Sequence, residues 1–69
     1  MELLNKLNVS KLVKINLEDS IMYSFTLDGK SCYLEVYEDE SILNVYENGK
    51  HVFGTAGTFE HCLNKLINE

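Results

Sequence analysis

The chain has 69 residues, a mass of 7.9 kDa, six Lys, no Arg and eleven Asp or Glu residues, so its formal net charge is −5. This length predicts one small domain over residues 1–69 with a thin core, and an apolar share of 45% is typical of a globular protein rather than of a disordered acidic tail. Direct binding of nucleic acid needs clustered cations, which this composition argues against. No apolar run is long enough to span a membrane, so we expect no membrane partner.

The N-terminal residues predict a short helix over residues 2–8 that uses Leu3, Leu4 and Leu7. Alternatively, this helix continues to Lys14 and replaces the first strand of the sheet. No basic leader followed by an apolar stretch is visible, so we expect no signal peptide and a cytoplasmic protein.

Residues 12–54 predict an antiparallel meander of four or five strands. Asp28-Gly29 and Asn48-Gly49 each lie between alternating apolar runs, which is the strongest short-range signal for a two-residue hairpin turn. The segments 27–30 and 47–50 are similar in sequence, and we interpret them as the same kind of turn used twice rather than as a sequence repeat. The first turn places three apolar pairs on one face, named here the core face: Phe25–Cys32, Tyr23–Leu34 and Ile21–Val36.

The other connections are predicted to place further apolar residues on the core face, because a slip by one residue would invert every face. A loop at residues 38–41 pairs Val36 with Leu43 and Leu34 with Val45. The turn at Asn48-Gly49 pairs Val45 with Val52 and places Glu47 opposite Lys50. A loop at residues 18–20 places Leu17 opposite Ile21 and adds Val13 and Ile15 to the core face.

The C-terminal residues predict a helix. Thr58 is a good N-cap, and an apolar stripe at helical spacing follows it: Phe59, Cys62, Leu63, Leu66 and Ile67. We expect this helix to cover the core face. The predicted fold class is therefore α+β: an antiparallel meander with a C-terminal helix on one face and a short N-terminal helix.

The opposite face of the sheet is predicted to be unusually rich in aromatic side chains. Its expected members are Met22, Ser24, Thr26, Tyr33, Glu35, Tyr37, Ile42, Asn44, Tyr46, His51 and Phe53. They form rows in which Tyr33 lies beside Tyr46, Asn44 beside Phe53, and Tyr37 beside Ile42. Its aromatic side chains offer about 600 Å² of amphipathic surface. This area is close to the area that one partner buries in a standard protein–protein interface. Either the N-terminal helix covers part of this face, or the chain self-associates through it, or a different protein binds there.

The segment from Glu35 to Glu47 is acidic, with Glu38, Asp39 and Glu40 in a loop and no Lys. Such a run is usually a solvated turn. Alternatively, it is an anionic stripe that occupies a cationic groove as duplex phosphates would, which would make the chain a nucleic-acid mimic. The expected partner is then a basic or nucleic-acid-binding protein.

The candidate catalytic residues do not combine into a site. Cys32 and His51 are predicted on opposite faces, and His61 and Cys62 are neighbours on a helix that point about 100° apart. Two cysteines thirty residues apart make no zinc site, and we expect both to be reduced and buried. We therefore predict no enzyme activity, no cofactor and no metal.

The sequence predicts a non-catalytic protein–protein interaction module, and the alternative is a structural homodimer that uses the same face. A small acidic chain without Arg or Pro is also typical of an inhibitor or adaptor encoded by a phage or mobile element, an argument from association rather than from physics. The predicted partner-binding residues are Tyr33, Glu35, Tyr37, Glu38, Asp39, Glu40, Ile42, Asn44, Tyr46, Glu47, His51 and Phe53.

Overall fold

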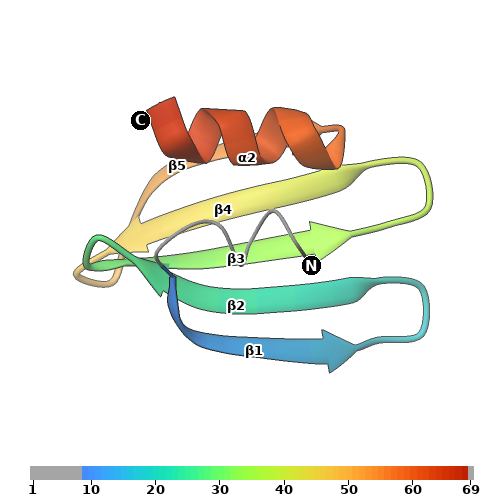
Figure 1. Cartoon of the computed structure of the whole chain (residues 1–69), viewed down its shortest axis with the longest axis horizontal. Coiled ribbons are helices and arrows are strands. Elements are labelled where there is room, and N and C mark those ends of the chain that lie inside the picture. The colour runs from blue at the N-terminus through green and yellow to red at the C-terminus, as the bar shows by residue number, and fades with distance from the viewer. Residues whose placement is uncertain (1–8, 69) are drawn as a thin grey trace.

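The structure, a computed structural model, describes residues 9–68 as five strands followed by one helix (Figure 1). The sheet is an antiparallel meander in the order β1-β2-β3-β4-β5, which confirms the α+β class. The helix predicted over residues 2–8 lies outside the described residues. The elements are β1 (Ser10–Asn16), β2 (Ile21–Leu27), β3 (Lys30–Val36), β4 (Ser41–Glu47), β5 (Lys50–Gly57) and α2 (Phe59–Asn68).

Both predicted two-residue turns are confirmed by their backbone angles. Asp28 and Gly29 have φ values of 51° and 79°, and Asn48 and Gly49 have values of 54° and 80°. Positive φ at both central residues defines the type I′ turn, whose twist matches that of the flanking strands. The register of β2 on β3 follows as predicted, with Phe25 opposite Cys32, and Glu47 lies opposite Lys50.

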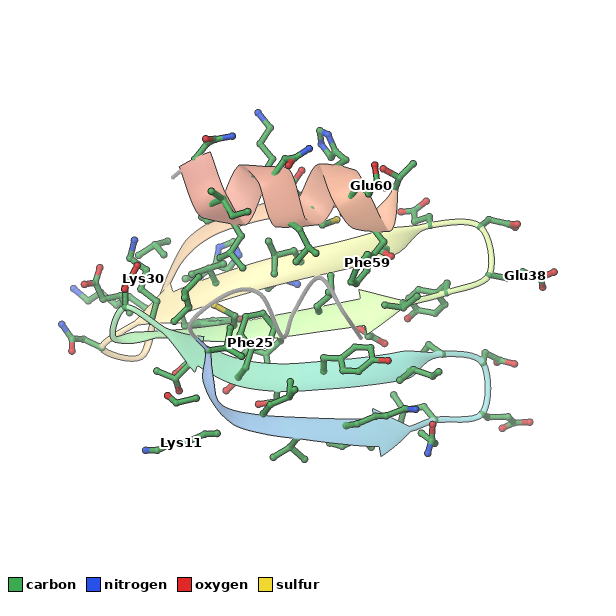
Figure 2. All side chains as sticks on the ribbon, viewed as in Figure 1. Lys11, Phe25, Lys30, Glu38, Phe59 and Glu60 are labelled. Atoms are coloured by element: carbon green, nitrogen blue, oxygen red, sulfur yellow. The ribbon has the colours of Figure 1, made fainter. Side chains whose placement is uncertain are left out.

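The predicted C-terminal helix is confirmed as α2. The Thr58 Oγ1 accepts a hydrogen bond of 3.0 Å from the His61 backbone N–H and so caps the helix. The Cys62 Sγ donates to the Ser41 backbone oxygen at 3.5 Å, which joins α2 to β4. Figure 2 shows Phe59 pointing towards the sheet and Glu60 pointing away from it. Ile67, predicted within the apolar stripe, is 56% exposed because a turn of about 100° per residue leaves it at the margin of that stripe.

The core lies between α2 and one face of the sheet. Cys62, Leu63 and Leu66 are buried on the helix and form one cluster with alternate buried residues of the three central strands. Successive side chains of a strand point to opposite faces, so this alternation identifies the core face. Its buried strand residues are Tyr23, Phe25, Cys32, Leu34, Leu43 and Val45.

The register of β3 on β4 differs from the prediction by two residues. The connecting loop is 37–40 rather than 38–41, so Val36 lies opposite Ser41 and Leu34 lies opposite Leu43. A hydrogen bond of 2.8 Å from the Tyr37 N–H to the Glu40 carbonyl closes the loop. Because the shift is an even number of residues, the predicted faces of both strands survive.

The predicted pairing of Val45 with Val52 is wrong, because β5 contains a bulge. His51 lies opposite Tyr46 and Phe53 lies opposite Val45, so Val52 is an extra residue between them. The bulge turns Phe53 onto the core face, where it packs against the buried cluster, and leaves Val52 47% exposed. Burying the larger Phe side chain yields more hydrophobic free energy than burying Val, which favours this arrangement.

The predicted face of β1 is also wrong, although residues 10–16 form a strand rather than a helix. Asn16, not Leu17, lies opposite Ile21, and the Leu17 N–H donates to the Ser20 carbonyl at 2.9 Å to close a loop at 17–20. This shift of one residue places Val13 and Ile15 on the face opposite α2. A second bulge lies between Ser10 and Val13, and every residue of β1 is exposed.

The first four strands repeat one structural plan, in which the same turn geometry occurs twice. β1 and β3 begin 20 residues apart, as do β2 and β4, and their loops at 17–20 and 37–40 close with the same hydrogen bond. Both loops contain Glu-Asp at the second and third positions. Residues 10–29 are named here the first unit and residues 30–49 the second unit.

Candidate functional site

The face of the sheet that points away from α2, named here the open face, is the candidate site. The register places on it a mixture of aromatic, aliphatic and small polar side chains with one carboxylate. Its strand residues are Ser10, Val13, Ile15, Met22, Ser24, Thr26, Ser31, Tyr33, Glu35, Ile42, Asn44, Tyr46, His51, Gly54 and Ala56.

Three rings form an aromatic cluster across β3, β4 and β5. The centroids of Tyr33 and Tyr46 lie 5.7 Å apart with an interplanar angle of 79°, and those of Tyr46 and His51 lie 5.2 Å apart at 66°. Such edge-to-face contacts hold each ring in a defined orientation. The predicted contact between Tyr33 and Tyr46 is present, but their predicted pairing is wrong, because Tyr33 lies opposite Asn44 and reaches Tyr46 diagonally.

A hydrogen bond fixes one end of the aromatic cluster. The His51 Nε2 lies 3.0 Å from the Asn44 Oδ1, and the imidazole donates when the proton is on that nitrogen. Gly54 leaves the necessary room, since a Cβ there would lie 2.7 Å from the Asn44 Oδ1 and 3.2 Å from the His51 Nε2. From the sequence His51 is expected on the aromatic face with a bond to a Tyr hydroxyl; the face is confirmed, but the hydrogen-bond partner is the Asn44 amide.

Glu35 lies on the open face of the central strand β3, one residue before its end, between Met22 of β2 and Ile42 of β4. Its Oε2 accepts a hydrogen bond of 2.8 Å from the Tyr37 hydroxyl and one of 3.5 Å from the Ser20 hydroxyl. The hydrogen bond to Glu35 is the main reason that the pKa of Tyr37 is raised above its ordinary value. Glu35 thereby ties the loop at 17–20 to the loop at 37–40.

The topology brings two acidic loops to the same end of the sheet, opposite the two hairpin turns (Figure 1). Glu18 and Asp19 join β1 to β2, and the predicted acidic residues 38–40 join β3 to β4. Figure 2 shows Glu38 pointing outwards from its loop. Asp19 lines a shallow open groove together with the second loop and Ile42. Sequence reasoning missed Glu18 and Asp19, although their Glu-Asp pair 20 residues before Glu38-Asp39 was a visible signal.

The open face lacks two of the predicted aromatic residues and gains two exposed aliphatic residues, besides four small ones. Phe53 lies on the core face, and Tyr37 lies in a loop, 37% exposed, rather than beside Ile42 in the sheet. In exchange the open face gains Val13 and Ile15, which are 51% and 43% exposed. Their alternation with polar residues was the signal of a strand, but it indicated the wrong face.

The two cysteines lie in the core, away from the open face. Cys32 and Cys62 are free thiols in the core, and burial raises the pKa of each. Cys32 is on the core face and His51 on the open face, as predicted. Residues 9–68 contain no group of three or more His, Cys, Asp and Glu side chains arranged to hold a metal ion. No helix in the described part of the chain is long and apolar enough to cross a membrane.

Comparison with known proteins gives no family. No protein family model matches the chain, and no curated protein or solved structure matches it.

Proposed function

We propose that the chain is a non-catalytic protein–protein interaction module that binds a partner protein through its open face, next to the acidic end of the sheet. The observation that carries this proposal is the exposure of large apolar side chains on that face. Tyr33, Val13 and Ile15 are each 40–51% exposed. Aromatic residues and a shortage of Lys are typical of the centre of a protein interface.

Both edges of the sheet support docking on the face rather than pairing along an edge. β1 and β5 are the edge strands, and each contains a bulge. Bulges disrupt the ladder of backbone hydrogen bonds and so oppose the addition of a further strand. A partner therefore gains more by burying the side chains of the open face.

The proposal is tested by affinity capture with Tyr33→Ala/Tyr46→Ala as the disrupting variant. Ile67→Ser is the matched control, because it also removes an exposed apolar side chain but from α2. We expect proteins captured by the wild type to be lost from the double variant and kept by the control. Equal capture by all three chains, each shown to be folded by circular dichroism, would contradict the proposal.

A homodimer through the same face is the second candidate, favoured by the extension of the exposed apolar surface onto β1. Light scattering over a dilution series separates the two. A constant mass near 7.9 kDa leaves the face free for a different protein, whereas a mass near twice that value assigns it to a second copy.

The acidic loops provide a further test of the kind of partner. Replacing Glu38, Asp39 and Glu40 by Ser is expected to weaken a complex with a basic protein, and the effect should grow as the salt concentration falls. The same replacement should leave a dimer formed through the open face unchanged. Isothermal titration calorimetry against the captured partner at two salt concentrations measures the difference.

A further inference from the structure

The register separates the lysines from the open face. Lys14, Lys30 and Lys50 lie opposite Tyr23, Leu27 and Glu47, at strand positions on the side of α2, and Lys65 is on α2 itself. The remaining described lysine, Lys11, is in the bulge of β1. Among the strand residues assigned to the open face, Glu35 is thus the one formal charge, so this face is complementary to a cation.

Glu35 retains capacity for a further ligand. Both of its hydrogen bonds, from Tyr37 and from Ser20, reach Oε2. A carboxylate offers about four acceptor positions, and no described residue donates a hydrogen bond to Oε1. The side chain is half-buried, and hydrogen bonds between charged groups strengthen where the surroundings exclude water.

The surroundings of Glu35 suit the planar guanidinium of Arg better than the ammonium of Lys. Tyr33 precedes Glu35 by two residues on the same face of β3 and is 40% exposed. A guanidinium stacks on an aromatic ring while it donates to a carboxylate, whereas an ammonium is a compact and strongly hydrated point charge. Asp19 and residues 38–40 lie at the adjacent end of the sheet and attract cations towards it.

We propose that the open face binds an arginine side chain of the protein partner, with the guanidinium hydrogen-bonded to the Glu35 Oε1 and stacked on Tyr33. This inference rests on the protein-binding function proposed above and names the group that the partner presents. Glu35 then has two tasks, because its Oε2 ties the two acidic loops together and its Oε1 receives the partner.

The test is a titration of the labelled full chain with N-acetyl-arginine N-methylamide at constant ionic strength, followed by two-dimensional NMR. We expect saturable shifts of the backbone amides of Tyr33 and Glu35 at millimolar probe. The matching lysine derivative should bind at least about threefold more weakly. Glu35→Gln should weaken binding of the arginine probe about tenfold, and the matched loop variant Glu38→Gln by less than about twofold.

A second variant distinguishes loss of the arginine site from loss of the hydrogen bonds that Glu35 accepts from Tyr37 and Ser20. Tyr33→Leu leaves the hydrogen bonds from Tyr37 and Ser20 to Glu35 in place. It is expected to weaken binding of the arginine probe about threefold. Equal losses in Glu35→Gln and Glu38→Gln, or no saturable shift at Tyr33 and Glu35, would overturn the inference. If the probe fails while Tyr33→Ala/Tyr46→Ala still abolishes capture, the arginine site is wrong and the protein-binding function stands. If the double variant captures as well as the wild type, the protein-binding function fails whatever the probe does.

Discussion

The first and second units share one backbone plan and differ in what they bury. Their strands begin 20 residues apart, and the two pairings have the same register from the loops as far as the bulge of β1. β3 nevertheless buries Cys32 and Leu34, whereas every residue of β1 is exposed. The equivalent strands β1 and β3 are thus an edge strand and a central strand of the same sheet.

The difference lies in which side of the strand carries the apolar residues. Lys14 occupies the position in the first unit that Leu34 occupies in the second, since each lies opposite a core residue of the next strand. Val13 takes the position of Tyr33, and Ile15 takes that of Glu35. Comparison of the units teaches that the loops and turns set the register, while the side chains decide which face becomes a core and which remains a surface.

The largest expected difference between the units is at positions 14 and 34. Leu34→Ala leaves a cavity in the buried core and should lower the free energy of unfolding by about 3 kcal/mol. Lys14→Ala removes an exposed side chain and should change it by less than about 0.5 kcal/mol. Urea unfolding followed by circular dichroism measures both values.

Because Leu34→Ala could leave too little folded protein to measure, Leu34→Met provides a milder change with an expected loss below about 1.5 kcal/mol. Similar losses of unfolding free energy at positions 14 and 34 would show that β1 packs on the core as β3 does. The inferred difference in burial between the two units would then be wrong.

The turns should respond alike, because here the units agree. Gly29 and Gly49 have φ values of 79° and 80°, and an added Cβ would meet no atom within 4 Å at either position. Gly29→Ala and Gly49→Ala should therefore each cost about 1–2 kcal/mol from backbone strain alone. Thermal unfolding of the two variants side by side gives the comparison, and clearly unequal losses would mean that the turns differ in ways the backbone angles do not show.

A smaller difference is expected at alkaline pH, because the second unit places Cys32 where the first has Leu12. Burial raises the pKa of the Cys32 thiol above its ordinary value. The folded state then holds its proton more tightly than the unfolded state, so the contribution of this thiol to stability is complete below about pH 8.5 and is lost as the pH rises through the raised pKa.

The measurement is the free energy of unfolding at about pH 7 and about pH 9.5, in a Cys62→Ala background because the Cys62 thiol also has a raised pKa. Adding Cys32→Ala should flatten the decline with pH. An unchanged slope would show that Cys32 does not titrate differently in the folded state.

The smallest expected effect concerns Tyr37 and Glu35, which replace Leu17 and Ile15 of the first unit. The hydrogen bond to Glu35 raises the pKa of Tyr37, so the tie between the loops persists below that raised pKa and is lost above it. Glu35→Gln should return the pKa of Tyr37 towards its ordinary value. NMR titration of the Tyr37 ring follows the change, and an unaltered pKa in the variant would contradict the assignment of this bond.

The sequence predicts those parts of the fold that have a local chemical cause. Asp28-Gly29 and Asn48-Gly49 require positive φ, Thr58 caps α2, and the stripe from Phe59 to Leu66 is apolar at helical spacing. Each of these signals acts within a few residues and needs no knowledge of the remaining chain.

The features that sequence analysis missed depend on competition between distant groups. The alternation of Val13 and Ile15 identifies a strand but not whether its apolar side is buried, and at an edge that side remains exposed. Nothing local to Val52 predicts a bulge, because its cause is the gain from packing Phe53 against the core. The aromatic cluster was predicted because an even slip of β4 preserves faces, whereas the odd shifts at β1 and β5 moved residues between faces.

The repeat has a consequence for how such a gene can change. A unit contains an even number of residues and begins and ends at equivalent points of the sheet. Duplication or loss of one whole unit would therefore add or remove two neighbouring strands and return every downstream side chain to its original face. An insertion of an odd number of codons within a strand would instead exchange the core face for the open face along the rest of that strand. Gain or loss of whole hairpins therefore changes the number of strands while every other residue keeps its face of the sheet.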